Sequence, residues 1–389
     1  MIRYLAFAFL SLLPFHATAD LAVTVGFLQQ KRILPPVLSN LDPVPDDLGR
    51  AGAVLGLDEN AKTGRFLGQT HALIEEVIEP EEDIAAAARA LLAQTDLLVI
   101  DATADALLSI ADMPEAAGAL LFNAGAEDTA LRDDACRANV LHTGTSLAMR
   151  TDGLAQFLVK KRWQDWALIA GTRPDDQAFA EAMRSSGTKF GLSLVGEKEW
   201  AFDADMRRNA AQEVPLFTQD IDDHDVLVIA DESRDFGRYV LFNTWTPRPV
   251  AGSEGLRPVG WSGVVEQWGA AQLQGRFERL AGREMRSRDY AVWAAIRIIG
   301  EAVTRTNAVD AAMLRGYILG DEFELAGFKG VPLTFRQWNG QLRQPIPLVH
   351  SAAVTAQAPM EGFLHQRNEL DTLGLDEPDS DCTAFEDLK

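Results

Sequence analysis

Few side chains in this 389-residue sequence are spaced as catalytic or metal-binding groups usually are. The six histidines never fall at the short spacing of a zinc-binding helix, and no Cys-x-x-Cys motif occurs. The sequence also lacks a Walker phosphate loop, a Gly-x-Gly-x-x-Gly after a strand and a Gly-x-Ser-x-Gly elbow. We therefore predict no metal, no cofactor and no enzymatic activity. A hydrolase is the alternative, because a Ser, a His and an Asp far apart in sequence can meet in space.

The densest acidic cluster runs from Asp220 to Asp225 and includes His224. Alternating carboxylates can bind hard cations, but this cluster lacks the glycine and the distal glutamate of a helix-loop-helix calcium site. We interpret it as a solvated loop that leads into a strand at Asp225. The whole chain is acidic, with a net charge of -21 at pH 7, which disfavours nucleic acid as a partner.

Residues 1–19 have the pattern of a cleavable secretory signal peptide. Arg3 supplies a positive charge, residues 4–15 form an apolar run, and Ala17-Thr18-Ala19 offers the small-x-small site that signal peptidase accepts. A membrane anchor is the alternative, but the run falls short of the roughly 20 residues that span a bilayer. We predict that the mature protein begins near Asp20, lies in the periplasm and is not embedded in the membrane.

The two cysteines, Cys136 and Cys382, are an even number in a chain that we expect to enter an oxidising compartment. One long-range disulfide is the simplest prediction, and two free thiols are the alternative. The bond would close a loop of roughly 250 residues, which in the chain-entropy model stabilises a fold by on the order of 5 kcal/mol. It would also fix the acidic tail after residue 370, which shows neither helical nor strand periodicity.

Short apolar runs alternate with helical segments in the first part of the chain. Runs of this length with helices between them indicate buried parallel strands. Gly49, Gly52 and Gly56 recur at helical spacing, which predicts close packing of their helix on the sheet. We predict strands over 21–28, 70–78, 97–100, 119–122 and 140–143, and helices over 47–60 and 82–94.

The same alternation resumes in the second part. Pro and Gly interrupt it over 240–261, which we interpret as a return crossing between two structural units. Asn339-Gly340 is a strong hairpin signal and would join the last two strands. We predict helices over 146–162, 176–185, 289–306 and 308–319, and strands over 167–170, 192–198, 225–230, 332–338 and 345–349.

The predicted fold class is α/β, with two open parallel sheets in two lobes. Ligands of open parallel sheets bind at the carboxyl ends of the strands. Because two such sheets would face each other, the cleft between the lobes is the predicted site.

Several segments of the sequence resemble a known family. TGRFLGQT (63–70), DDACRANVLHT (133–143) and SRDYAVWAAIRIIGEA (287–302) are similar to the type I periplasmic solute-binding proteins of ABC transporters, in the branched-chain amino-acid binding class. GFKGVPLTFRQWNGQLRQPI (327–346) and the tail QRNELDTLGLDEPDSDC resemble the subfamily associated with PQQ-dependent alcohol dehydrogenase systems.

The resemblance implies a periplasmic binding protein type I fold, with two lobes joined by a three-crossing hinge. The N-terminal lobe would comprise residues 20–143 and about 250–327. The C-terminal lobe would comprise 144–249 and about 328–350. Residues 351–389 would form a tail that the disulfide docks on the N-terminal lobe.

The resemblance also implies ligand contacts at the strand ends and the hinge. Each expected contact has a structural alternative: Asp101 as a helix cap, Arg173 in a surface ion pair, Trp245 in the hinge core. Where the amino-acid binders have small hydroxyl residues after the third and fourth strands, this sequence has DATADA and NAGAED, which disfavours an amino acid as ligand. The expected contacts are Gln29, Lys31, Asp101, Thr103 and Asn123 in the first lobe and Arg173, Glu232 and Trp245 in the second.

By this resemblance the protein would capture a small solute and deliver it to an ABC transporter permease, in a pathway of PQQ-dependent alcohol oxidation. The ligand could be an alcohol-derived metabolite, PQQ itself or a lanthanide complex. The alternatives are a sensing or assembly module of the dehydrogenase system and a branched-chain amino-acid binding protein.

Overall fold

The computed structural model describes residues 21–33, 43–201 and 206–386, so the predicted signal peptide lies outside the described residues. Five parallel strands form the first sheet, in the order β2-β1-β3-β4-β5. The strands are β1 (Leu21–Gln30), β2 (Gln69–Ile78), β3 (Leu97–Asp101), β4 (Leu120–Asn123) and β5 (Val140–His142). A strand was predicted at each of these positions.

Helices cover both faces of this sheet. Val99 of β3 packs into the core shared with one layer of helices, and its neighbour Leu98 packs into the core shared with the other. Because both faces of the sheet are buried, successive residues of a strand are all apolar, and the strand appears in the sequence as a continuous apolar run. The first layer holds α1 (Arg50–Gly64), α8 (Ala270–Ala281), α9 (Ser287–Thr306) and α10 (Ala311–Ile318); the second holds α2 (Ile84–Leu92) and α3 (Ala104–Ala111).

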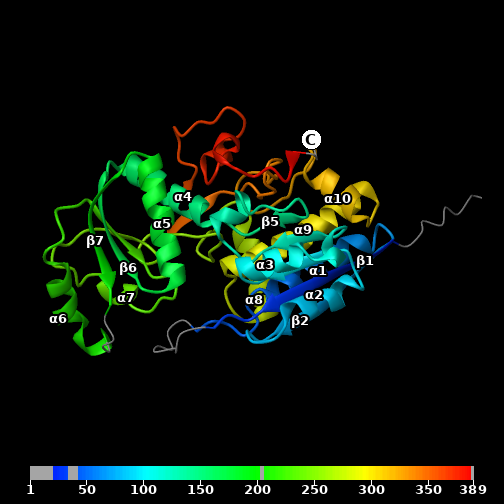
Figure 1. The fold of residues 1–389 in the computed structure, drawn as a ribbon, viewed down its shortest axis with the longest axis horizontal. Helices are drawn as coiled ribbons and strands as arrows, with labels where there is room; N and C mark the ends of the chain where they lie inside the picture. The colour runs from blue at the N-terminus through cyan, green and yellow to red at the C-terminus, as the bar shows by residue number, and fades with distance from the viewer. Residues whose placement is uncertain (1–20, 34–42, 202–205, 387–389) are drawn as a thin grey trace, which may run out of the picture.

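The second lobe repeats this arrangement around a parallel sheet of order β7-β6-β8-β9 (Figure 1). Its strands are β6 (Asp165–Gly171), β7 (Ser193–Trp200), β8 (Val226–Ala230) and β9 (Val250–Gly252). Its helices are α4 (Leu147–Lys161) and α5 (Pro174–Lys189) on one face, and α6 (Met206–Thr218) and α7 (Gly237–Val240) on the other. The predicted α/β class with two parallel sheets is confirmed.

The predicted hairpin over 332–349 is wrong. Residues 332–338 form isolated bridges, of which one pairs Phe335 with Leu342. The turn at Asn339-Gly340 exists, but the chain then leaves the first lobe before the next strand begins. That strand, β11 (Ile346–His350), pairs with β10 (Arg257–Pro258) and β12 (Ala353–Ala358) in a small antiparallel sheet that packs on α4.

Two expectations about the crossings also change. Within 240–261, residues 250–252 form β9 of the second sheet, so this crossing begins only after Gly252. Leu333, Phe335 and Leu342 pack in the core of the first lobe, although the sequence placed 328–350 in the second. The third crossing therefore lies between Leu342 and Ile346.

The small residues of α1 contact a helix and not the sheet. A Cβ atom on Gly52 would lie 2.0 Å from the carbonyl oxygen of Asp289 on α9, and one on Gly56 would lie 2.9 Å from Ile296. From the other side, a Cβ on Gly300 would meet Asn60 at 2.3 Å. The glycine spacing is therefore structural, and it allows α1 and α9 to approach closely.

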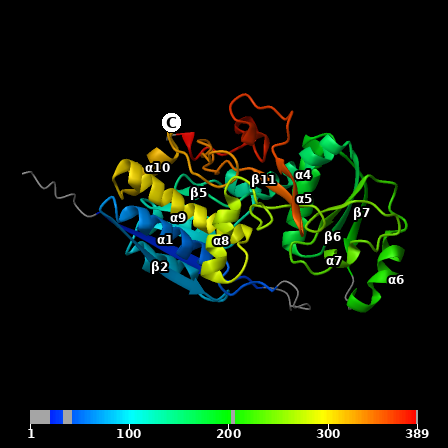
Figure 2. The same cartoon turned by 180° about the vertical axis from the view of Figure 1, so that it is seen from behind.

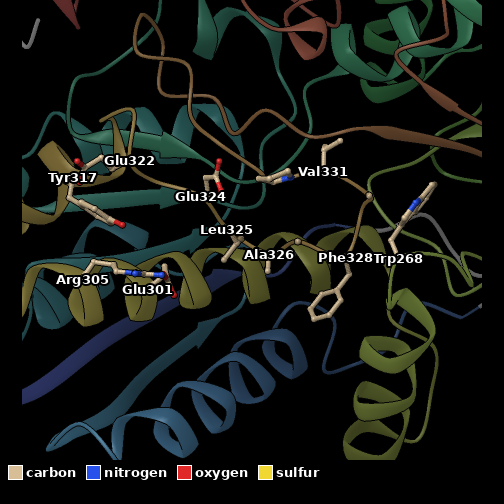
Figure 3. A pocket seen from close by; sticks show the side chains of 13 residues that line it. Trp268, Glu301, Arg305, Tyr317, Glu322, Glu324, Leu325, Ala326, Phe328 and Val331 are labelled. Carbon is tan, nitrogen blue, oxygen red and sulfur yellow. The ribbon is translucent and has the colours of Figure 1, made fainter.

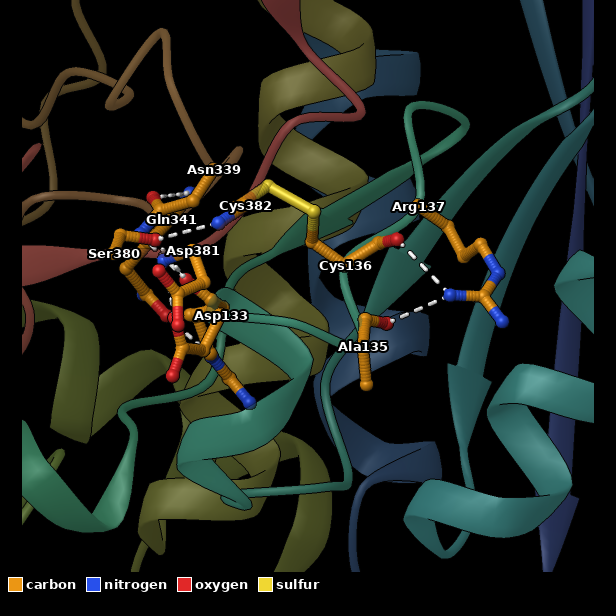
Figure 4. Close-up of a disulfide and its surroundings, with 10 residues drawn as sticks. Asp133, Ala135, Cys136, Arg137, Asn339, Gln341, Ser380, Asp381 and Cys382 are labelled. Carbon is orange, nitrogen blue, oxygen red and sulfur yellow. Dashed lines mark hydrogen bonds between the residues drawn. A yellow bond between two sulfur atoms is a disulfide. The ribbon is translucent and has the colours of Figure 1, made fainter.

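The predicted disulfide is present between Cys136 and Cys382, with an S–S distance of 2.07 Å (Figure 4). The tail is described through residue 386 and contains two short 3-10 helices, Glu369–Thr372 and Glu377–Asp379. Two more occur in the first lobe, Pro114–Ala116 and Thr129–Arg132. Seen from behind, the tail runs along the edge of the molecule that joins the two lobes (Figure 2).

Candidate functional site

A network of charged side chains lies where the strand ends of the first lobe approach the second. Gln29, near the end of β1, donates from Nε2 to the Asp101 carboxylate (2.7 Å) and to the carbonyl of Leu48 (2.7 Å). Asp101 ends β3, is buried, and also pairs with Arg288 of α9. Burial opposes the charge of Arg288, but Asp101 and Glu127 raise its pKa overall.

Arg150 of α4 joins the two lobes. Its Nη1 donates to Glu127 (2.7 Å), in the loop after β4 of the first lobe. Both of its Nη atoms donate to Glu232 (2.8 and 3.0 Å), which follows β8 of the second lobe. Glu232 also accepts from Ser253 Oγ (2.8 Å). Burial opposes the charge of Arg150, but the two glutamates raise its pKa overall.

Two buried carboxylates position the loop that carries Glu232. Asp176 accepts a hydrogen bond from the backbone N–H of Glu232 (2.7 Å), and Asp231 accepts from the N–H groups of Phe236 (2.9 Å) and Gly237 (2.6 Å). Burial, together with the charge of Asp231, raises the pKa of Asp176 to about 6. The carboxylate of Glu232 is therefore held on a fixed loop.

Arg32, two residues after β1, is the cation of this network that no carboxylate neutralises directly. Its Nη2 donates to the carbonyl of Gly125 (2.8 Å), and among the described residues it forms no ion pair. The like charge of Arg288 is the main cause that lowers the pKa of Arg32, whose side chain is exposed. Asp101 of the first lobe and Asp175 of the second favour its charged form. A guanidinium in this position can receive an external carboxylate.

The structure brings three of the predicted contacts into this network: Gln29, Asp101 and Glu232. Asp101 is not the cap of the next helix; Thr103 caps α3 and accepts from the N–H of Ala106 (3.4 Å). Asn123 is buried, and its Oδ1 accepts from the N–H groups of Gly125 (3.1 Å) and Ala126 (2.9 Å). Asn123 therefore shapes the loop that ends at Glu127.

The other predicted contacts lie outside the network. Lys31 forms an exposed ion pair with Glu79 (2.5 Å). Arg173 is the N-cap of α5, and its backbone N–H donates to Asp176 (3.4 Å). Trp245 is 62% exposed, and its backbone N–H bonds to Thr218 at the end of α6 (2.9 Å).

The expectation that Trp245 lies at a crossing is wrong. Thr218 precedes β8, so Trp245 is at the amino end of the second sheet, away from the edge that carries Glu232. The reason is that residues 241–249 return the chain to the start of β9 before it leaves the lobe.

Sequence reasoning missed the cations that organise the network. Arg150 and Arg288 lie on helices, and nothing in their local sequence distinguishes them from surface arginines. Glu127 could have been found, because it lies in the NAGAED stretch that follows a predicted strand.

Lys329 lies beside the crossings and is buried. Its Nζ donates to Gln344 Oε1 (2.6 Å) and to the carbonyl of Pro345 (3.2 Å), and it lies 4.6 Å from the centroid of the Tyr290 ring. Gln344 in turn donates to the carbonyl of Thr143 in the first crossing (3.0 Å). Burial lowers the pKa of Lys329 well below its ordinary value of 10.5.

This burial predicts a pH dependence of stability. Between its lowered folded pKa and 10.5, the unfolded chain binds a proton at Lys329 that the folded protein does not, so stability rises with pH in that window. We expect Lys329→Met to flatten the rise of the unfolding free energy as the pH increases toward 10.5 in urea titrations. Lys62→Met, on the exposed face of α1, is the matched control and should leave the slope unchanged. Equal slopes in the wild type and Lys329→Met would contradict the prediction.

The acidic cluster at 220–225 is consistent with a surface loop. Asp220 pairs with Lys198, Asp223 pairs with Arg248, and Asp225 accepts from the N–H groups of Gln164 (2.9 Å) and Asp165 (3.1 Å). Across the ranges that the structure covers, no three His, Cys, Asp or Glu side chains are grouped to hold a metal ion. Nor does any helix in those ranges have the length and apolar character needed to cross a bilayer.

A separate hollow of about 920 Å³ lies on the first lobe alone (Figure 3). Trp268, Phe328 and Val331 line one end of it, and Glu322 and Tyr317 lie at the other (Figure 3). None of its lining residues belongs to the charged network, and none comes from the second lobe.

Comparison with known proteins identifies the architecture. Residues 47–211 match the periplasmic binding protein family. No curated protein sequence matches the chain at a significant level. The solved structures that resemble it include three binding proteins of ABC transporters.

An ABC transporter substrate-binding protein from Sphaerobacter thermophilus has a TM-score of 0.69 and 16% identity, over 91% of this chain and 100% of that one. A branched chain amino acid ABC transporter periplasmic ligand-binding protein from Burkholderia xenovorans has a TM-score of 0.67 and 15% identity, over 86% and 95%. The closed leucine-, isoleucine-, valine-, threonine- and alanine-binding protein from Brucella ovis has a TM-score of 0.64 and 12% identity, over 84% and 88%. The chain therefore has the type I periplasmic binding protein fold.

Proposed function

We propose that this protein is the periplasmic solute-binding component of an ABC transporter, which holds a small solute between its lobes and delivers it to the permease. The fold supports this role, since the structural neighbours with this architecture include binding proteins of such transporters. The charged network supports it as well. It draws Glu127 from the first lobe and Glu232 from the second to one arginine at the carboxyl ends of both sheets.

The strongest support for the proposal comes from the positive charge of Arg32, which no ion pair within the described residues balances. Two of the three acids that favour its charged form already pair with other arginines, Asp101 with Arg288 and Glu127 with Arg150. Arg32 has only the Gly125 carbonyl as an acceptor among the described residues. We therefore propose that the solute carries a carboxylate, which Arg32 binds.

This chemistry bears on the candidate ligands. Of the solutes expected from the link to PQQ-dependent alcohol oxidation, an organic acid or PQQ, which carries carboxylates, fits Arg32 better than a neutral alcohol does. A lanthanide ion fits poorly, because arginines already hold Asp101, Glu127 and Glu232. A branched-chain amino acid is the second candidate, because Asp175 of the second lobe could pair with its ammonium group while Arg32 holds its carboxylate.

The test is a binding screen of the mature protein by thermal shift and calorimetry, using short organic acids, amino acids, alcohols, PQQ, and calcium and lanthanide ions. A ligand that binds only the folded state raises the melting temperature by mass action. For the carboxylate that binds, we expect Arg32→Ala to weaken affinity about 10- to 100-fold, as the loss of a charge-assisted hydrogen bond worth about 1.5–3 kcal/mol requires.

Arg50→Ala is the matched control, because Arg50 lies on α1 near the same strand end but pairs with Glu75 at the surface (2.8 Å). It should leave the affinity unchanged. Tight binding of a neutral alcohol that Arg32→Ala does not weaken would refute the proposed role of Arg32. No binding of any compound, together with co-purification of a dehydrogenase, would refute the transport role.

A further inference from the structure

The C-terminal segment makes a fourth passage between the lobes. Beyond β12 the chain still belongs to the second lobe, where Met360 and Leu373 pack in the core with α4 and α5. It then returns to the first lobe, where Cys382 and Phe385 pack in the core with β5 and α9. We propose that residues 370–385 form a strap, the C-terminal strap, that limits how far the two lobes can rotate apart.

The second lobe holds the strap through α4 and α5. The buried carboxylate of Asp152 accepts from the N–H of Gly374 (2.7 Å) and from Lys189 Nζ (2.7 Å). Lys189 Nζ also donates to the carbonyls of Gly374 (2.8 Å) and Thr372 (3.3 Å). Gln156 donates to the hydroxyl of Thr372 (3.0 Å). These bonds fix residues 372–374 to the second lobe.

The first lobe holds the neighbouring residues of the same segment. Arg336 is 1% exposed and donates to the carbonyls of Leu370 (2.9 Å), Leu373 (2.5 Å) and Leu375 (3.1 Å). Arg336 lies between Phe335 and Leu342 in the sequence, and both of these residues pack in the core of the first lobe. Residues 370–375 are therefore bound by both lobes at once.

The far end of the strap is anchored to the first lobe. Ser380 Oγ donates to the carbonyl of Arg132 (3.0 Å), and the N–H of Asp381 donates to the Asp133 carboxylate (2.6 Å). Cys382 completes the anchor through its disulfide to Cys136 (Figure 4). Rotation of the second lobe away from the first must therefore break the hydrogen bonds of residues 370–375, because the disulfide prevents the strap from following.

If the protein binds a solute as proposed, a restricted rotation of the lobes should also affect the affinity for that solute. When few open conformations are available, the conformation that holds solute on both lobes makes up a larger fraction of the free protein. The apparent Kd is inversely proportional to that fraction, so it falls as the fraction rises. Releasing the strap should therefore weaken solute binding as well as widen the distribution of lobe separations.

The test measures lobe separation without any solute. Fluorophores on non-natural amino acids at Glu76 and Glu199, exposed residues near the carboxyl ends of β2 and β7, would report it by single-molecule energy transfer. We expect Cys136→Ser/Cys382→Ser to broaden the distribution toward larger separations. Lys189→Met, which keeps the disulfide, should broaden it to a smaller extent. Lys62→Met is the control and should match the wild type.

An unchanged distribution in both folded variants would overturn the proposal, and circular dichroism would establish that each variant is folded. Because no solute is needed, this outcome does not depend on the proposed function. If the distribution broadens and no compound in the screen binds, the proposed role of the strap is supported and the proposed transport role is refuted. For a solute that does bind, Kd should rise several-fold in Lys189→Met; an unchanged Kd would refute the link between strap and affinity.

Discussion

Replacing Cys136 and Cys382 together with serine is expected to lower the free energy of unfolding by about 5 kcal/mol. The two residues are 246 positions apart, so the bond closes a loop that contains the second lobe and, from the first lobe, β5 and the helices α8, α9 and α10. In the chain-entropy model, the loss of so large a closed loop gives the unfolded chain a large gain in entropy. Urea denaturation of the wild type and the double variant, followed by fluorescence, measures the difference.

The native contacts around the bond give this prediction a control. Asp381→Ala removes only the side chain next to Cys382 and keeps the disulfide, so it should change stability by less than about 0.5 kcal/mol. Mass spectrometry of the non-reduced protein should find Cys136 and Cys382 linked in the wild type. A loss below about 1 kcal/mol in the double variant would show that the unfolded chain does not gain the expected entropy.

The fold could be predicted wherever the local pattern determines the element. The apolar runs at β3, β4 and β8 are buried on both faces, and this pattern is available in the sequence alone. The hairpin at Asn339-Gly340 was predicted by the same kind of reasoning and failed. Its turn is local, but the partner of β11 is decided by the crossing that carries the chain into the second lobe.

Some elements were missed because their sequence signal is weak. The polar helix α6 contains Pro215. The N-cap of α8 is Gly269, which has a left-handed conformation and follows a Gly- and Pro-rich stretch. The order of the tail was missed for a different reason. Residues 370–375 have no periodicity of their own, and they are fixed by Arg336, Asp152 and Lys189, which are distant in sequence.

The residues of the site also fall into those that could be predicted from local sequence and those that could not. Gln29, Asp101 and Glu232 were predicted because each lies at the end of a recognisable strand, and the structure places all three in one network. The arginines that neutralise the acids come from helices whose approach depends on the packing of whole lobes. The sequence could therefore indicate which strand-end residues come together, but it could not show that Arg32 is the group with no ion-pair partner among the described residues.

The second large effect is expected from Arg336→Met. Arg336 and Asp371 form an ion pair at 2.9 Å with exposures of 1% and 0%, and the same guanidinium donates to three backbone carbonyls. Removing one partner of a buried pair leaves an uncompensated charge, which costs roughly 3–5 kcal/mol. Arg343 still pairs with Asp371 (2.8 Å), so the loss should fall at the lower end of that range. Urea denaturation measures the loss, and hydrogen exchange should show its largest increase at residues 370–375.

The surface offers a matched comparison, because Arg367 also pairs with an acid of the tail, Glu377, but is 66% exposed. Exposed ion pairs contribute about 0–1 kcal/mol, so Arg367→Met should hardly change stability. Arg336→Met combined with Asp371→Asn should not recover the loss, because it leaves Arg343 without the carboxylate that it pairs with. If Arg336→Met were no more destabilising than Arg367→Met, Arg336 could not be the residue that holds residues 370–375 to the first lobe, and the disulfide would be the main attachment of the C-terminal strap there.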